Sequence, residues 1–189
     1  VPRPDGNFGN CNPKNKKNIR TRCSAIIKGK SLNIIIDTSP DMRQQLIDNR
    51  ITNIDKVLFS HYHADQTHGI NDLRLFYLKY KKKINIYSDL ETKKYLFKSF
   101  KYCFQNFKNY PAVLKHKNLK KTHVFDVGKD KIKIEYVRVK HGYIDSLGYL
   151  INNKCAYISD ANEIYKNELL KLKNLKYLIV DCLRYKKHN

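Results

Sequence analysis

Three histidines and one aspartate lie within the eight residues from His61 to His68, directly after the apolar segment 57–59. A lone histidine most often belongs to the surface or the core, but a cluster at a strand end lies where loops carry function. His61 and His63 are two residues apart, so an extended backbone directs both side chains to one side, and Asp65 continues that alternation. Two imidazoles and a carboxylate suit zinc, manganese or iron. The sequence therefore predicts a metal site at the end of a buried strand.

The hydrophobic pattern predicts a mixed sheet with helices packed against it, because strand-like and helix-like segments alternate and some strands are joined as hairpins. The predicted strands cover 24–27, 32–36, 56–60, 84–87, 131–140, 147–151, 155–159 and 177–180. The predicted helices cover 42–48, 70–80, 91–104 and 162–172, and the predicted loops cover 1–23 and 105–121. The length suits one core, so we expect residues 1–189 to form a single domain.

The chain has a formal net charge of +21, with 38 lysines and arginines against 17 acidic residues. Such a charge normally suggests a nucleic-acid partner. However, lysine far outnumbers arginine, and lysine, asparagine, isoleucine and tyrosine share A/T-rich codons. The lysines are also spread along the whole chain. We therefore favour a solvated lysine surface that attracts small phosphorylated substrates, with a nucleic-acid partner as the less favoured alternative.

Cysteine content and hydropathy indicate the cellular compartment. The five cysteines are odd in number and form no C-x-x-C pair, which favours reduced thiols over a disulfide framework. No apolar run approaches the ~20 residues that a membrane helix needs, and the first residues lack the features of a signal peptide. We expect a cytoplasmic protein that does not associate with membranes. The sequence makes no prediction of its oligomeric state.

Two later residues are candidates to complete the metal site. His141 follows the predicted strand 131–140, and Asp160 follows the predicted strand 155–159. Alone, the histidine could be an ordinary surface residue and the aspartate a helix cap. Together with the first cluster, they supply a third imidazole and a carboxylate able to bridge two ions.

The order of these motifs resembles the metallo-β-lactamase superfamily, and more narrowly the branch that contains phosphoribosyl 1,2-cyclic phosphate phosphodiesterase. The N-terminal matching stretches are Val1-Pro2-Arg3, the segment 18–24, and Ile36-Asp37-Thr38-Ser39-Pro40-Asp41. The later ones are the segment 64–74, Tyr110-Pro111, His141-Gly142, Ser146-Leu147-Gly148-Tyr149, Ser159-Asp160 and Asp181-Cys182-Leu183-Arg184. The resemblance covers essentially the whole chain. It implies an α+β fold, an αβ/βα sandwich with a dinuclear metal centre at its rim.

The resemblance also implies a metal-dependent hydrolase, a phosphodiesterase acting on a small cyclic phosphate or nucleotide-like ester. His61, His63 and His141 would bind the first ion and Asp160 would bridge. Asp65 would bind the second ion and is the catalytic candidate. The implied cofactors are up to two divalent ions, zinc or manganese. A metal-bound hydroxide would be the nucleophile, its pKa lowered by the ions.

Four residues are candidates for substrate binding: Arg20, Arg22, Arg74 and His68. A guanidinium matches phosphate oxygens bidentately, which favours the arginines for this role. Ordinary ion pairing is an equally good explanation, for instance between Arg74 and Asp72 or Asp37. His68 could also simply support the loop.

Gln66 departs from the family pattern, because the superfamily usually has a second-metal histidine at this position. An amide oxygen is a harder and weaker ligand. It favours manganese or magnesium over zinc, or leaves the position partly empty. We expect fewer than two tightly bound ions.

The ends depart as well. Relatives begin with a glycine-rich strand before the match to Val1-Pro2, and continue past the match to Leu183-Arg184-Tyr185 to supply a last metal-binding histidine. His188 does not match that ligand. We therefore expect truncation at both ends, a sandwich incomplete at its edges with an exposed sheet edge, and low activity of this chain alone.

Two other functions compete with the phosphodiesterase. An RNA-processing nuclease of the same superfamily is mildly favoured by the positive charge. It is disfavoured by the lack of a long RNA-gripping insertion and by the match around residues 20–24. A degenerate, non-catalytic remnant is favoured by Gln66 and by the ends.

Overall fold

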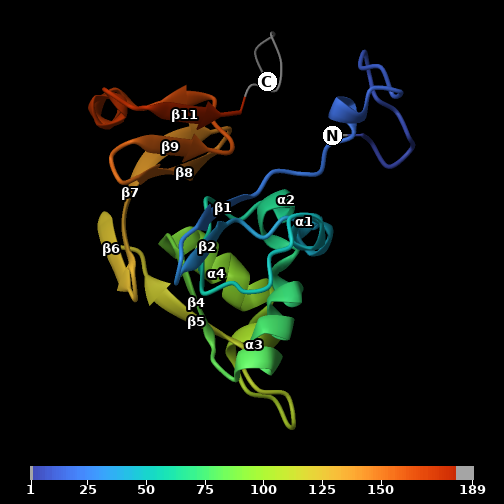
Figure 1. The fold of residues 1–189 in the computed structure, drawn as a ribbon, viewed down its shortest axis with the longest axis vertical. Coiled ribbons are helices and arrows are strands. Elements are labelled where there is room, and N and C mark those ends of the chain that lie inside the picture. Colours follow the sequence, from blue (N-terminus) through green and yellow to red (C-terminus); the bar gives the residue numbers. More distant parts are fainter. Residues whose placement is uncertain (1, 182–189) are drawn as a thin grey trace.

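Two β-sheets pack face to face in the computed structural model, which describes residues 2–181, and helices cover both outer faces (Figure 1). The α+β sandwich predicted from the sequence is confirmed. Val1, the stretch from Cys182 to Arg184 and His188 lie outside the described residues. No helix within residues 2–181 has the length and apolar character to cross a membrane.

The first sheet has the strand order β1-β2-β3-β4-β5. Its strands are β1 (Ala25–Lys28), β2 (Asn33–Ile36), β3 (Lys56–Leu58), β4 (Ile84–Ser88) and β5 (Leu114–Asn118). The pair β1–β2 is antiparallel, and β2 to β5 run parallel to their neighbours. The segments that follow β2 and β3 therefore leave the same edge of the sheet.

The second sheet has the order β10-β7-β8-β9-β11, with β6 also paired to β7. Its strands are β6 (Thr122–Val127), β7 (Asp130–His141), β8 (Ile144–Ile151), β9 (Cys155–Ile158), β10 (Glu163–Ile164) and β11 (Tyr177–Val180). β11 runs parallel to β9, and the other pairs are antiparallel. β7 is long enough to pair with β6 near its start and with β10 near its end.

Alternation along the strands divides the core into layers. Between the sheets, Ile34, Ile36 and Leu58 pack in one cluster with residues of β7 and β8 that include Ile134 and Tyr149. The neighbouring positions in the first sheet face the opposite way, and they include Ile35, Val57, Ile84 and Ile86. The inner strands of the first sheet are therefore buried on both faces, which explains the nearly continuous apolar run of β2.

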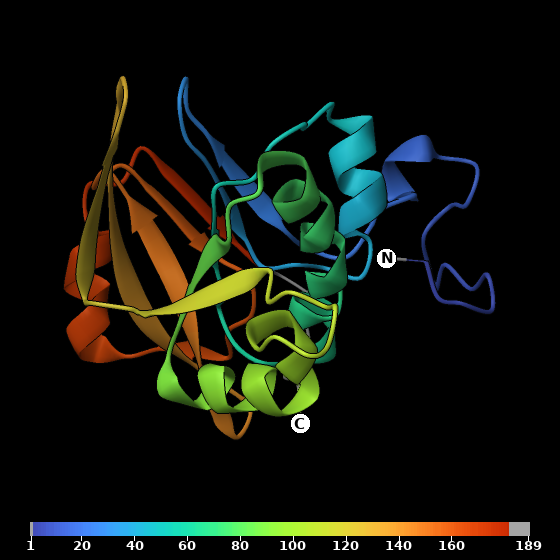
Figure 2. The same ribbon diagram turned by 90° about the horizontal axis from the view of Figure 1, so that it is seen from below.

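Helices of the first half cover the first sheet, and the short helices after β10 cover the second (Figure 2). The α-helices are α1 (Met42–Asp48), α2 (Ala64–Thr67), α3 (Arg74–Tyr80), α4 (Leu90–Ser99), α5 (Lys101–Phe104) and α6 (Lys166–Leu169). The 3₁₀-helices are η1 (Lys16–Asn18), η2 (Ile70–Leu73) and η3 (Leu170–Leu172).

Three sequence predictions of secondary structure were wrong in part. The predicted loop 105–121 contains β5, which the pattern hides because an edge strand carries exposed lysines. The predicted helix 162–172 begins as β10, paired with β7, before α6 and η3. The predicted helix 91–104 is two helices that meet at Phe100, whose backbone is not helical (φ −125°, ψ 36°).

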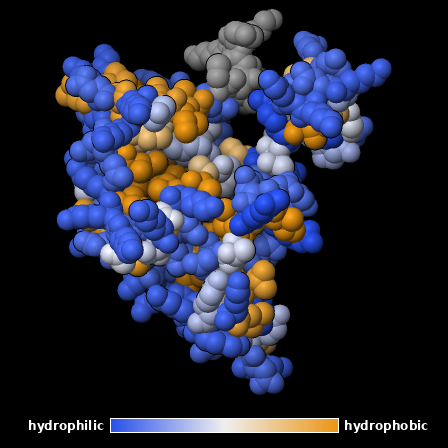
Figure 3. All heavy atoms as spheres, in the orientation of Figure 1, coloured by the Kyte–Doolittle hydropathy of each residue, from blue (hydrophilic) through white to orange (hydrophobic). Residues whose placement is uncertain are grey.

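β11 is an exposed edge of the second sheet. All four of its side chains are between 43% and 57% exposed, although all four are apolar or aromatic. Figure 3 shows hydrophobic residues gathered on the face of the molecule that is turned to the viewer in Figure 1. The segment before β1 projects away from the sheets (Figure 1).

Gly69 permits the close packing of the α2 loop on the turn after β2. A Cβ atom there would lie 2.0 Å from the carbonyl oxygen of Ser39, which is too close for any side chain. The same contact is closed by two hydrogen bonds, from Gly69 N to Thr38 O (2.9 Å) and from Thr38 N to Gln66 O (2.8 Å).

We predict that Gly69→Ala destabilises the fold by about 1–3 kcal/mol, because the backbone on one side of the contact must shift. Urea unfolding followed by circular dichroism measures the loss. Gln44→Ala, on the exposed face of α1, is the control and is expected to unfold like the parent chain. An unchanged midpoint for Gly69→Ala would contradict the tight contact.

Candidate metal centre

Three imidazoles meet where β3 and β7 end. His61 and His63 follow β3, and His141 is the last residue of β7. One nitrogen from each ring lies within 4.8 Å of the others. His61 is almost fully buried, and His63 and His141 are half-buried, so the cluster has an inner and an open side. The sequence predicted these three residues as the ligands of one ion, and the fold brings them together.

The spacing of the nitrogens suits a single metal ion. His63 Nδ1 lies 3.2 Å from His141 Nε2. Two nitrogens bound to zinc at about 2.0–2.1 Å in a tetrahedral site lie roughly 3.3 Å apart. The rings meet edge to face, with centroids 4.6 to 5.0 Å apart. The donor set therefore has the chemistry and the spacing of a metal site.

The surroundings of the inner histidine, His61, also suit a bound metal ion. His61 Nδ1 lies 2.9 Å from Ser60 Oγ and 3.3 Å from Ser146 Oγ. Its other nitrogen, Nε2, is buried and has no hydrogen-bond partner among residues 2–181. A buried polar atom without a partner is costly and rare. A metal ion bound by Nε2 would remove that cost, so these residues fit the group that they are predicted to hold.

A buried carboxylate orients His61 through Ser60. Ser60 donates hydrogen bonds to Asp37 from its backbone N–H (2.7 Å) and from its hydroxyl (2.8 Å). When Asp37 is ionised, the Ser60 hydroxyl donates its proton to Asp37, and the Ser60 oxygen accepts from His61 Nδ1–H. Ser159 Oγ donates to the same oxygen at 3.2 Å. The network thus selects the tautomer of His61 whose Nε2 carries a lone pair.

The surroundings of His61 and His63 favour their neutral forms. Burial, assisted by the neighbouring His63 and His141, lowers the pKa of His61 to about 3. Burial also lowers the pKa of His63, assisted by His141. Neutral imidazole is the form that binds metals, so no proton has to leave these rings at neutral pH.

Two hydrogen bonds join the sheets directly behind the site. Leu147 N, on β8, donates to Ser60 O at 2.9 Å. Tyr149 Oη, fully buried on the same strand, donates to Phe59 O at 2.7 Å. Together they hold the segment after β3 against the second sheet, which fixes the distance between His61 and the end of β7.

A carboxylate–amide group lies beside the triad. Asp160 follows β9, and Gln66 Nε2 donates to its Oδ2 at 2.9 Å and to Asp65 Oδ2 at 3.3 Å. Burial, assisted by the charges of Asp65 and Asp181, raises the pKa of Asp160 to about 6. Asp65 itself is exposed. Gln66 therefore contacts both carboxylates of this group.

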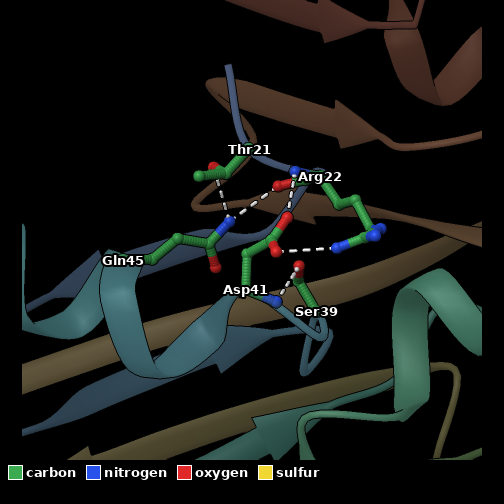
Figure 4. A network of polar contacts seen from close by, with 5 residues as sticks. All are labelled: Thr21, Arg22, Ser39, Asp41 and Gln45. Carbon is green, nitrogen blue, oxygen red and sulfur yellow. Dashed lines mark hydrogen bonds and ion pairs between the residues drawn. The ribbon is translucent and has the colours of Figure 1, made fainter. Parts of the chain in front are cut away.

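Arg22 is held in the N-terminal segment by Asp41 (Figure 4). Asp41 accepts from the backbone N–H of Arg22 at 2.8 Å and from its guanidinium at 2.7 Å. Gln45 Nε2 donates to Thr21 Oγ1 and to Arg22 O, and Ser39 Oγ accepts from Asp41 N. The arrangement ties residues 21–22 to the turn that precedes α1.

The other substrate candidates are dispersed. The Cζ atom of Arg74 lies 3.9 Å from the centre of the Tyr110 ring, so its guanidinium stacks on that ring. His68 is exposed, and its Nε2 lies 3.0 Å from Tyr95 Oη. Arg20 is exposed in the N-terminal segment.

Sequence reasoning missed the residues that support the histidines. Asp37 was considered only as part of a matching stretch and as an ion-pair partner of Arg74, and Ser60, Ser146 and Ser159 were given no role. Asp37, Ser60 and Ser159 offered a signal, since each follows an apolar strand within two residues, whereas Ser146 lies inside β8. Cys23 was also missed, because its segment is far from Gln66 in the chain.

Comparison with known proteins identifies relatives. A family model described as the beta-lactamase superfamily domain matches residues 32–189. An octanoyltransferase from Porphyromonas gingivalis (strain ATCC BAA-308 / W83) is 32% identical over 183 residues. The match covers 95% of this chain but only 36% of that protein, so its name describes a much longer polypeptide.

Two solved structures are similar. A diphosphatase from the PhnP family is 26% identical with a TM-score of 0.81, over 93% of this chain and 65% of that one. Zinc-bound PqqB from Methylobacterium extorquens is 16% identical with a TM-score of 0.64, over 87% and 62% of the two chains. The second likeness is one of fold alone. The chain spans less than two thirds of each of these relatives.

We predict that the metal-free protein loses stability between pH 6.5 and pH 8 through Asp37. Burial raises the pKa of Asp37 from 3.8 to about 8, although the hydrogen bonds from Ser60 oppose the shift. The folded state then holds a proton that the unfolded state has lost, so the stabilisation is complete below about pH 4 and disappears as the pH rises through 8. Asp160 and His61 titrate below this window.

Urea unfolding in chelator at pH 6.5 and pH 8 measures the change, which we expect to be on the order of 1 kcal/mol. Asp37→Asn cannot titrate and is expected to show no such slope. Asparagine also tolerates the left-handed backbone of this residue (φ 63°). Equal slopes in the two proteins would contradict the assignment.

We predict that Ser60→Ala weakens metal binding by about 10- to 100-fold, because the hydroxyl that orients His61 is lost. Competition with a metallochromic chelator measures the affinity. Ser99→Ala, at the exposed end of α4, is the matched control and should bind metal like the parent. Unchanged affinity in Ser60→Ala would rule out the orienting role.

Proposed function

Because the chain belongs to the beta-lactamase superfamily domain family, we propose that it is a metal-dependent phosphodiesterase acting on a small cyclic phosphate or nucleotide-like ester. The observation that carries the proposal is the cluster of three imidazoles, in which the buried Nε2 of His61 has no partner among the described residues. Similarity to a PhnP-family diphosphatase supports a phosphorylated substrate. Octanoyl transfer is not carried over, since the match covers a minor part of that relative.

The ligands in this proposal are His61 through Nε2, His63 through Nδ1 and His141 through Nε2. A divalent ion such as zinc or manganese, when bound there, would lower the pKa of a coordinated water and offset negative charge on the attacked phosphate. Asp65 is exposed beside the triad and is assigned to catalysis, where an ionised carboxylate can accept a proton from the attacking water. Asp160 is less exposed to solvent than Asp65.

A cleft at the β7–β8 turn has the size of a small-molecule site, although none of the three histidines lines it. It has a volume of about 640 Å³ and begins at Gly142, the residue after His141. Ligand sites for small molecules are typically about 300–1,000 Å³. Arg138 and Lys140 line it, and Asp145 pairs with Arg138 at 2.9 Å.

The net charge of +21 keeps an RNA-processing nuclease as the second candidate. Phosphate contacts from many lysines give binding that falls steeply with salt. A small-molecule phosphodiesterase has no such steep dependence, because its substrate carries few charges.

We predict that the metal-loaded chain hydrolyses bis-p-nitrophenyl phosphate and a cyclic ribose phosphate at a low rate, and that His141→Ala loses both metal and turnover. The loss is expected because one of three ligands is removed. Initial rates with zinc or manganese, measured beside bound metal, provide the test. His123→Ala, on β6 away from the triad, is the matched control.

The outcomes separate the candidates. Cleavage of precursor RNA without hydrolysis of the cyclic phosphate would replace the proposal with the nuclease. Tightly bound metal without turnover of any substrate would identify a non-catalytic remnant. Turnover that survives in His141→Ala would remove the triad from the chemistry.

A further inference from the structure

Gln66 lies against Asp65 and Asp160, the two carboxylates that the family resemblance assigns to a second ion. It is fully buried on α2, and it touches both carboxylates beside the histidine triad. Its amide nitrogen donates to Asp160 Oδ2 (2.9 Å) and to Asp65 Oδ2 (3.3 Å). The carboxylates that could share a second cation are therefore already joined by one N–H₂ group.

The amide is held in this orientation from its other side. The Cys23 thiol donates to Gln66 Oε1 at 3.6 Å, and the amide nitrogen lies 3.2 Å from the same sulfur. Turning the amide over would bring Oε1 against the carboxylate of Asp160, two acceptors with no proton between them. The nitrogen, which cannot bind a metal, contacts both carboxylates as well as the sulfur, and the oxygen, which could bind one, contacts only the Cys23 thiol among these groups.

An N–H₂ group has two hydrogens and no available lone pair, so it acts toward carboxylates as a partial positive charge. Asp65 and Asp160 repel one another, as the raised pKa of Asp160 indicates. A second divalent ion is one way to offset that repulsion. The donor hydrogens of Gln66 are another, and they occupy the same side of both carboxylates.

We infer that the Gln66 amide takes the place of a second cation, so the chain binds one divalent ion, at His61, His63 and His141, and not two. This rests on the metal site of the proposed function. The paired carboxylates are then ordered by hydrogen bonds, and Asp65 stays free of metal to act on protons.

Metal stoichiometry tests the inference without any assay of activity. Metal-free protein is titrated with Co²⁺ alone, followed by its visible absorption, and the bound metal is counted by elemental analysis after gel filtration. We expect one equivalent for the parent chain. Gln66→His supplies an imidazole in place of the amide, and we expect two equivalents.

Gln66→Glu is the second variant, because it keeps the size of the side chain and is the safer choice for folding. It replaces the donor group with a carboxylate, which leaves three acidic side chains together, and we expect two equivalents again. Gln44→His, an exposed position on α1, is the matched control and should bind one equivalent. Circular dichroism checks that each variant keeps the parent fold.

The results discriminate between this inference and the proposed function. Two equivalents of similar affinity in the parent chain would overturn the inference and leave the hydrolase standing. One equivalent in the parent and also in both folded Gln66 variants would overturn it as well, because position 66 would not control the count. If the parent binds no metal, the proposed function fails and the inference fails with it.

Discussion

Ser60 is the single residue on which the candidate site most depends. Its backbone carbonyl accepts from Leu147 in the second sheet, and its hydroxyl lies between Asp37 and His61. Sheet packing and ligand orientation are thereby determined by the same residue. A small displacement of the two sheets would change the direction of His61 Nε2. The metal site is consequently a property of the whole sandwich and not of the histidine loop alone.

Much of this architecture could be predicted from the sequence. Two-residue spacing predicted that His61 and His63 face the same side, and apolar strands before His141 and Asp160 predicted that both lie at a sheet edge. The family resemblance read from these motifs is confirmed by the match over residues 32–189. The strands with continuous apolar runs, such as β2, were also predicted correctly, because a strand buried on both faces leaves that pattern.

Other features depend on contacts that no local pattern encodes. β5 has lysines at an edge, so burial gives it almost no hydrophobic signal. Asp37 is fully buried because the turn after β2 packs against Ser60, which follows β3. This contact exists only once the sheet is assembled. The pairing of Cys23 with Gln66 joins residues 43 positions apart. The sequence indicated an unusual residue at position 66, but only the fold indicates which end of its amide faces the carboxylates.

The turn of residues 37–41 also limits how this protein can change during evolution. Its first residue orients the buried histidine, its middle residues accept the close approach of Gly69, and its last residue holds Arg22. A substitution selected for its effect on the N-terminal segment would be transmitted to the metal ligands through this one turn. Adaptation to new substrates is therefore expected to proceed first through the β7–β8 end of the cleft, where side chains can vary without moving the turn.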